Sequence, residues 1–278
     1  MDTVIPRQCL AVFDYDGTTA DTAAPSPNGV TVTAAYSYAL MEMFGVQDLL
    51  EEIGGLQNRT PRELIEDIVA GDRHLRLRTC GRRYFETHRD RLWAMLPTSR
   101  NRRPRHSGLI DTLTETLVRV KLSYLLDEIG HAWPKPFDGV LDTFEAMRRD
   151  GTAAAIVSSG HECFIRKSFE FWGVPCPNVL LTDDDCRAYD IDPKPNAGLI
   201  DLMLALSHRY RTSAAPILQK RNIIGHFGDC EIKDGGLAAN AGVPFFWFNR
   251  ANRKPRVSLP ENTVVFSDWR TVSDGVLT

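Results

Sequence analysis

Short apolar runs alternate with amphipathic stretches along the second half of the 278-residue chain. Each apolar run ends in small or polar residues, as do strands that lead into loops. We expect strands at residues 10–13, 153–158, 178–182, 222–227 and 244–248, and an edge strand at 263–267. Helical patterns lie between them, at residues 139–150, 162–172, 196–211 and 235–241. This alternation predicts an α/β fold with a Rossmann-like parallel sheet core.

The segment between the first two expected strands carries no convincing strand pattern. Amphipathic periodicity predicts helices there instead, at residues 30–44, 61–69, 81–96 and 109–129. Proline-rich stretches at 24–29 and 133–136 bracket this segment, as the linkers of an inserted domain would. We therefore expect an all-helical inserted domain at 25–134, and an α/β core formed by 1–24 and 135–278.

Charge is distributed unevenly along the chain. The net charge is −3, yet residues 73–105 hold eleven arginines and two acidic residues, and the first lysine of the chain is Lys121. An arginine-rich surface of this kind could recruit a polyanion such as a nucleic acid. The arginines also interleave with apolar residues, as on the solvated face of an ordinary amphipathic helix, and we favour that interpretation. Nucleic acid is therefore not an expected partner.

The six cysteines are scattered, with no Cys-x-x-Cys pair and no histidine at zinc-finger spacing. Such a distribution indicates free thiols in a reducing compartment rather than a zinc site. No run approaches the ~18 apolar residues of a membrane-spanning helix. We therefore expect a soluble cytoplasmic protein with no membrane partner, and the sequence leaves its oligomeric state open.

Two carboxylates, Asp14 and Asp16, follow the first apolar run and precede a Gly-Thr turn. On a continuous strand they would share one face and repel each other, so they would need a cation or a shared proton. That arrangement is typical of a metal-assisted nucleophile beside an acid or base. An Asx-type turn after a strand would explain the same residues without any chemistry.

Polar groups also follow later apolar runs. Ser158, Ser159 and Gly160 precede a helix, where a hydroxyl and backbone N–H groups can bind an anion. Lys194 lies between two prolines before another helix, and Asp229 follows a glycine at a strand end. Parallel sheets gather functional groups at the carboxyl ends of their strands, so these groups are expected to meet. Taken singly, Ser158 is better explained as a helix cap and Lys194 as a solvated loop residue.

Together these segments resemble the haloacid dehalogenase superfamily of hydrolases, in all four of its motifs and in their order. The matching segments are Asp14–Thr18 (DYDGT), Ile156–Gly160 (IVSSG), Asp192–Asn196 (DPKPN) and Gly228–Asp234 (GDCEIKD). The helical insertion between the first two motifs is similar to the superfamily's helical cap of the C1 type. The resemblance covers nearly the whole chain and implies a phosphatase-type member.

The resemblance implies that the first motif carries the chemistry. Asp14 would be the nucleophile that forms an aspartyl-phosphate, and Asp16 would act as the acid and then the base. Mg²⁺ would be bound by the Asp14 carboxylate, the Asp16 backbone carbonyl and Asp229, with Asp234 as the second acid of the metal site. Hard oxygen ligands of this kind suit Mg²⁺.

The second and third motifs would bind the transferring phosphoryl group. The resemblance implies this role for Ser158, Ser159 and Gly160. Lys194 would neutralise charge on both Asp14 and the phosphoryl oxygens. Phosphoryl transfer depends mainly on such positioning and charge neutralisation.

The fourth motif departs from the superfamily's commoner pattern. Four residues separate Asp229 from Asp234, where three are usual, although the longer spacing also occurs in the superfamily. Asp234 is the expected second acid, and Glu231 is the competing candidate. The acidic run Asp183–Asp185, near another strand end, is expected only to form a turn and a helix cap.

The superfamily contains dehalogenases, phosphonatases, phosphomutases and phosphatases, so its fold does not settle the reaction. Its dehalogenases lack the second acid of the first motif, and Asp16 argues against that activity. Its phosphonatases use a lysine early in the cap, and residues 29–120 contain none. We expect Mg²⁺-dependent hydrolysis of a small phosphorylated metabolite. A phosphomutase of the β-phosphoglucomutase type is the alternative, and polyanion binding by the arginine-rich segment comes third.

In related caps, a glycine-containing turn before a helix reaches the active site. Residues 54–61 fit that description, which makes Arg59 and Arg62 candidates for binding the substrate. Pairing of Arg62 with Glu66 at an ordinary helix start explains the sequence equally well.

Overall fold

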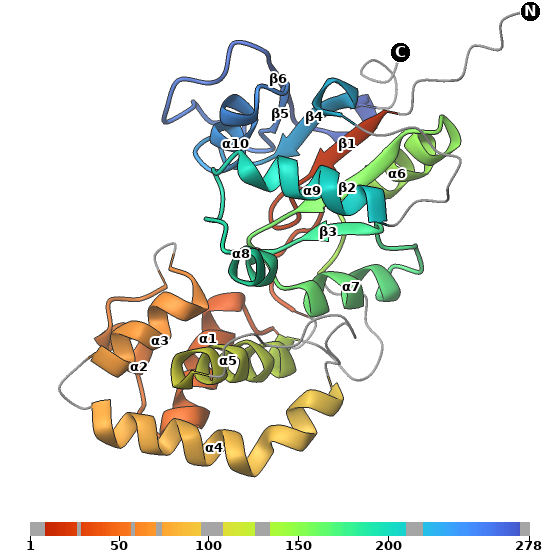
Figure 1. Cartoon of the computed structure of the whole chain (residues 1–278). Helices are drawn as coiled ribbons and strands as arrows, with labels where there is room; N and C mark the ends of the chain where they lie inside the picture. The colour runs from red at the N-terminus through yellow and green to blue at the C-terminus, as the bar shows by residue number, and fades with distance from the viewer. Residues whose placement is uncertain are drawn as a thin grey trace, which may run out of the picture. The chain divides into compact units, whose positions relative to one another are not determined.

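The computed structural model of the chain describes residues 9–26, 29–56, 59–70, 74–95, 108–125, 134–209 and 219–272. The chain divides into two compact units. Residues 1–22 and 134–278 form the first, here called the core unit, and residues 23–133 form the second, the helical unit. Figure 1 shows the strands of the described chain gathered in the core unit.

The core unit is built on a six-stranded sheet with the strand order β3-β2-β1-β4-β5-β6 (Figure 1). The strands are β1 (Leu10–Phe13), β2 (Ala153–Val157), β3 (Val179–Leu181), β4 (Ile223–Gly228), β5 (Phe245–Phe248) and β6 (Thr263–Phe266). Every neighbouring pair of strands is parallel. The expected α/β fold with a Rossmann-like parallel sheet is confirmed, and β6 lies at the edge as expected.

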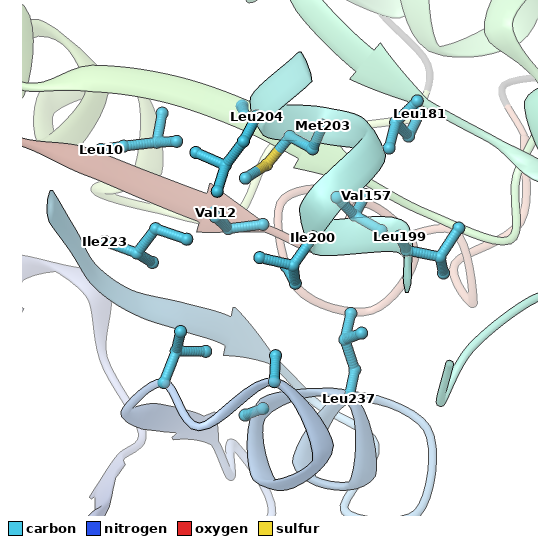
Figure 2. Close-up of a cluster of buried hydrophobic side chains, with 14 of the residues drawn as sticks. Leu10, Val12, Val157, Leu181, Leu199, Ile200, Met203, Leu204, Ile223 and Leu237 are labelled. Carbon is cyan, nitrogen blue, oxygen red and sulfur yellow. The ribbon is translucent and has the colours of Figure 1, made fainter. Parts of the chain in front are cut away.

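Helices lie between the strands in the sequence and cover both faces of the sheet. They are α6 (Val140–Arg149), α7 (Glu162–Phe171), α8 (Asp183–Tyr189), α9 (Gly198–Arg209) and α10 (Asp234–Ala241), with 3₁₀ turns η1 (Lys220–Asn222) and η2 (Trp269–Thr271). Figure 2 shows the aliphatic layer on one face, where Leu10 and Val12 of β1 lie among Ile200 and Met203 of α9 and Leu237 of α10.

The opposite face of the sheet is aromatic. Phe13 of β1 stacks on Phe227 of β4 with ring centroids 4.8 Å apart, and it meets the Phe144 ring of α6 edge-on at 4.7 Å. The indole of Trp269 packs near both Phe13 and Phe227. Successive strand residues point to opposite faces, so β1 contributes to both layers at once. This two-sided burial explains why the whole β1 run is apolar, and it anchors the strand end where Asp14 begins.

The helical unit contains α1 (Val32–Phe44), α2 (Leu49–Glu52), α3 (Pro61–Ala70), α4 (His74–Met95) and α5 (Leu109–Leu125) (Figure 1). Its described residues include no strand. Leu40 of α1, Leu64 of α3 and Leu117 of α5 are fully buried in one shared apolar cluster. None of the helices in the described part of the chain has the length and hydropathy needed to cross a bilayer.

The start expected for α4 at residue 81 is wrong, because the helix begins at His74. Leu77, in the added turn, is buried in the apolar cluster of the helical unit. Gly81 lies inside the helix, where a Cβ would come within 2.8 Å of Leu113 and 2.9 Å of Phe44. The glycine is there for close helix packing and does not mark a helix end. The arginines expected at 100–105, and the helix ends expected at 126–129 and 210–211, lie outside the described residues.

Candidate active site

The first motif forms a tight turn at the carboxyl end of β1. The strand stops one residue before Asp14, whose N–H donates to the Phe227 carbonyl at 2.8 Å. The Tyr15 carbonyl then accepts backbone N–H groups from the following residues, including that of Ala20 at 2.9 Å. Asp14 and Asp16 therefore do not share a strand face, and the turn is what brings them together. The interaction between their charges contributes to raising the pKa of Asp14.

A buried lysine joins two carboxylates at this edge of the sheet. The Nζ of Lys194 lies 2.6 Å from Oδ1 of Asp14 and 2.6 Å from Oδ1 of Asp234. Burial alone would lower the pKa of Lys194, but the two carboxylates outweigh burial and raise it, so the ammonium is charged. For Asp234, burial alone would raise the pKa, but Lys194 and His226 outweigh burial and lower the pKa well below its usual value. Lys194 is therefore no solvated loop residue.

Three carboxylates converge beside this lysine. One oxygen from each of Asp14, Asp229 and Asp234 lies within 4.8 Å of the other two. Burial, with a contribution from Asp234, raises the pKa of Asp229 to about 6. Burial also raises the pKa of Asp14 well above its usual value, although Lys194 opposes it. The single positive charge of Lys194 does not neutralise all three carboxylates. A cluster of hard oxygen ligands of this kind fits a divalent cation such as Mg²⁺.

Asp229 is held in place by groups from three segments. Its backbone carbonyl accepts from Trp247 Nε1 at 3.0 Å and from Arg253 Nη2 at 2.7 Å. Its carboxylate packs against Gly17, where a Cβ would come within 2.8 Å of Oδ2. Gly17 also has a φ of 76°, which side-chain-bearing residues rarely adopt. These contacts aim the Asp229 carboxylate at the turn that carries Asp14 and Asp16.

The second motif forms a small polar turn between β2 and α7. Ser158 is buried, and its Oγ accepts the N–H of Gly160 at 3.0 Å. A Cβ on Gly160 would lie 3.0 Å from Oδ2 of Asp16 and 3.3 Å from Oγ of Ser158. Ser159 lies in the same turn and is partly exposed. The structure therefore brings Asp16, Ser158 and Gly160 together, at a place where a side chain on residue 160 would be tightly packed.

The two candidates for the second acid have different partners. Asp234 opens α10 and belongs to the carboxylate cluster, at 1% exposure. Glu231 instead accepts the backbone N–H of Arg256 at 3.0 Å, and its other oxygen lies 3.9 Å from Arg253. The geometry thus favours Asp234 over Glu231.

The two arginines expected to contact substrate have partners within the helical unit. Arg59 pairs with Asp67 at 3.2 Å. Arg62 contacts Glu66 at 2.7 Å and Asp111 at 2.6 Å. The Arg62–Glu66 pairing is the one that an ordinary helix start would produce, while substrate binding by either arginine stays a prediction. Residues 57 and 58 of the same loop lie outside the described residues.

Two residues beside the site were missed by sequence reasoning. Arg253 follows β5 in a basic loop, and only the folding of the chain brings it against Asp229, 24 residues away in the sequence. His226 was included in the apolar run of β4, yet it is fully buried with Nε2 3.1 Å from Oδ1 of Asp234. A histidine inside an otherwise apolar strand, two residues before Gly-Asp, was the signal that could have identified it.

Comparison with known proteins finds relatives by fold and none by sequence. No family model matches the chain, and neither does any curated protein. CbbY from Rhodobacter sphaeroides, solved with phosphate, has 12% identity and a TM-score of 0.54 over 95% of both chains. A predicted phosphoglycolate phosphatase from Haemophilus somnus has 12% identity and a TM-score of 0.53 over 97% of this chain and 98% of its own.

A third similar structure is a 2-haloacid dehalogenase from Pseudomonas syringae pv. Tomato. It has 17% identity and a TM-score of 0.51, over 97% of this chain and 98% of its own. Identities this low establish the fold alone. The similarity nevertheless runs through both units of the chain, since each comparison covers 95% or 97% of it.

Proposed function

We propose that this chain, which has the fold of the haloacid dehalogenase superfamily of hydrolases, is a Mg²⁺-dependent phosphohydrolase for a small phosphate ester. The observation that carries the proposal is the buried Asp14–Lys194–Asp234 arrangement beside Asp229. Burying two carboxylates around one ammonium, with a third partly buried beside them, is costly for a fold. Such clusters of perturbed pKa values are characteristic of sites that handle charge.

Asp14 is the proposed nucleophile. Its carboxylate oxygen attacks the phosphorus of the ester, the bond from phosphorus to the leaving oxygen breaks, and an aspartyl-phosphate forms. Asp16, protonated at the start, gives its proton to the leaving oxygen, which departs as an alcohol. Water then attacks the phosphorus and returns a proton to Asp16, releasing inorganic phosphate and the Asp14 carboxylate. The net reaction is hydrolysis, and both carboxyl groups end as they began.

The neighbouring groups would bind and neutralise the phosphoryl oxygens. The Ser158 hydroxyl and the N–H groups of Ser159 and Gly160 lie at the start of α7, where an anion is favoured. Lys194 would contribute its positive charge to both Asp14 and the phosphoryl group. Preorganised donors of this kind act mainly on charge that develops during transfer.

A divalent cation, proposed to be Mg²⁺, would be held by the Asp14 carboxylate, the Asp16 carbonyl and Asp229, with Asp234 nearby. When bound, it would neutralise the carboxylates and the phosphoryl oxygens. The helical unit is the proposed cap that selects the substrate, with Arg59 and Arg62 as its candidate contacts. The small-molecule phosphate ester is the proposed partner of the site.

The proposal is tested by following release of inorganic phosphate from p-nitrophenyl phosphate and from a panel of phosphorylated metabolites, with Mg²⁺ present. Asp14→Asn should abolish release, because an amide is a far weaker nucleophile. Asp201→Asn, which alters an exposed carboxylate paired with Lys220, is the matched control and should leave activity intact. Turnover that survives in Asp14→Asn, or no release from any substrate by the unaltered protein, would contradict the proposal.

A further inference from the structure

A buried histidine lies behind the carboxylate that holds Lys194. His226 projects from β4 and is fully buried, with Nε2 3.1 Å from Oδ1 of Asp234. The same oxygen accepts from Lys194 Nζ at 2.6 Å, while Oδ2 accepts the N–H of Cys230 at 3.1 Å. Asp234 thus faces three donors, one in β4, one in the turn directly after β4 and one in the loop before α9.

The chemistry of this contact fixes the hydrogen on the ring. An ionised carboxylate can only accept, so the nitrogen that faces Asp234 must carry a hydrogen. The group that His226 presents to Asp234 is therefore an Nε2–H donor.

The position does not need a histidine for packing. Its register partner Val12 and Ile223 of the same strand belong to the buried aliphatic cluster, and an apolar side chain at residue 226 would extend that layer. Burying an imidazole costs free energy unless it makes a hydrogen bond. The Asp234 carboxylate provides that bond, so the histidine is best explained by what it does to Asp234.

Two positive charges can compete for the Asp234 carboxylate. One is the ammonium of Lys194. The other is the cation expected between Asp14 and Asp229, whose carboxylate oxygens lie within 4.8 Å of an Asp234 oxygen. The Asp14 carboxylate loses its charge when it carries the phosphoryl group, and Asp234 then remains the protein counter-ion that holds Lys194 beside the phosphoryl oxygens. A carboxylate that turned toward the cation would leave that ammonium poorly placed.

We infer that His226 is a positioning residue that keeps Asp234 directed at Lys194 rather than at the metal. The inference rests on the proposed function. Without the Nε2 hydrogen, Oδ1 of Asp234 keeps one hydrogen-bond donor, Nζ of Lys194. The carboxylate can then turn, and Lys194 shifts with it relative to Asp14.

Three variants separate positioning from packing. His226→Phe keeps the ring volume and removes the donor, and His226→Gln returns an N–H donor. Ile223→Ala lies at the other end of the same strand, in the apolar layer, and serves as the control for lost stability. Each is measured for kcat and KM on p-nitrophenyl phosphate with saturating Mg²⁺, and for its thermal midpoint.

We expect His226→Phe to lower kcat about 10- to 100-fold, as is usual when the partner of a site ligand is lost. Its KM should stay within about threefold, because binding of the substrate is not what changes. His226→Gln should recover most of the lost kcat, and Ile223→Ala should lower the midpoint while keeping kcat. Equal kcat in His226→Phe and the unaltered protein, or no recovery in a folded His226→Gln, would overturn the inference.

A second readout needs no substrate. In nitrogen-15 NMR spectra of the unaltered protein, the His226 ring should carry a hydrogen on Nε2, the nitrogen that faces Asp234. A ring whose only hydrogen is on Nδ1 would overturn the inference. If the unaltered protein instead released no phosphate from any substrate, the proposed function would fail while the NMR result would still decide the geometry of His226.

Discussion

Lys194→Met removes the ammonium that Asp14 and Asp234 share and keeps a side chain of similar length. Deleting one partner of a buried ion pair costs about 3–5 kcal/mol, because the other charge stays buried without compensation. Here two carboxylates each lose a partner at 2.6 Å. We therefore expect the free energy of unfolding to fall by an amount near the upper end of that range, about 5 kcal/mol at pH 7. For a unit of this size, that corresponds to a fall of about 10–20 °C in Tm.

The loss of unfolding free energy in Lys194→Met should become smaller as the pH falls. In the unaltered protein the pKa of Asp234 is depressed, so its contribution is present above the unfolded pKa and is lost as the pH drops through the folded one. In Lys194→Met the two buried carboxylates bind protons more tightly when folded than when unfolded. The variant therefore gains relative stability in acid, and the difference from the unaltered protein narrows below pH ~5.

The assay is urea unfolding followed by tryptophan fluorescence, with EDTA present so that no divalent cation compensates the carboxylates. Lys220→Met is the matched control, because Lys220 also pairs with an aspartate, Asp201, at 3.0 Å but is 43% exposed. An exposed pair contributes at most about 1 kcal/mol. The reasoning is refuted if Lys194→Met loses no more stability than Lys220→Met, or if its deficit at pH ~4 is the same as at pH 7.

Three further outcomes are expected. EDTA should remove phosphatase activity and excess Mg²⁺ should restore it, since Asp14 and Asp229 are short of positive charge; turnover without metal would count against the carboxylate cluster as a metal site. Asp16→Asn should slow hydrolysis of alkyl phosphates about 10²- to 10⁴-fold and that of p-nitrophenyl phosphate less, because good leaving groups need little acid assistance; equal losses would contradict its role. In the helical unit, Tyr84 and Tyr124 both donate to Glu42. Burial and this carboxylate raise the pKa of Tyr124 to about 12, so the folded unit holds its proton and loses stability as the pH rises from ~10 to ~12. Thermal melts across this range should show that slope, and Glu42→Gln should flatten it; an equal slope in the variant would refute the explanation.

The sheet was predictable because its pattern is imposed by burial. Strands covered on both faces, such as β1, must be apolar at every position, and this leaves a clear signal in the sequence. The start of α4 was not predictable in the same way. Gly81 looked like a helix boundary, but a glycine is needed there because Leu113 and Phe44, which lie far away in the sequence, pack closely against it. Glycine gives the same local signal in both situations.

The structure of the acidic run at the start of α8 was predicted in part. Asp183–Asp185 were expected to form a turn and a helix cap, and they form the first turn of α8, where Thr182 and Asp185 make a capping box. The helix itself was missed because it is only seven residues long and directly follows β3. Short helices carry too few apolar positions for periodicity to identify them.

The site was predictable where it depends on strand ends and not where it depends on long-range contacts. Asp14 and Asp229 were candidates because they follow strands, and Lys194 was a candidate because its segment before a helix resembles the third motif of the superfamily. The choice between Asp234 and Glu231 needed the position at which α10 starts. Arg253 and His226 have partners that only the folded chain brings close. The local sequence could mark His226 as unusual in an apolar strand, but it could not assign its partner.

The central claim is that Asp14 carries the phosphoryl group during turnover. The most direct measurement is to mix the protein with substrate and Mg²⁺, quench in acid during turnover, reduce with borohydride and sequence the peptides by mass spectrometry. Reduction of an aspartyl-phosphate converts that aspartate to homoserine. The account predicts homoserine at position 14 in the unaltered protein and none in Asp14→Asn. Phosphate release with no modification at Asp14, or with the modification at another aspartate, would contradict it.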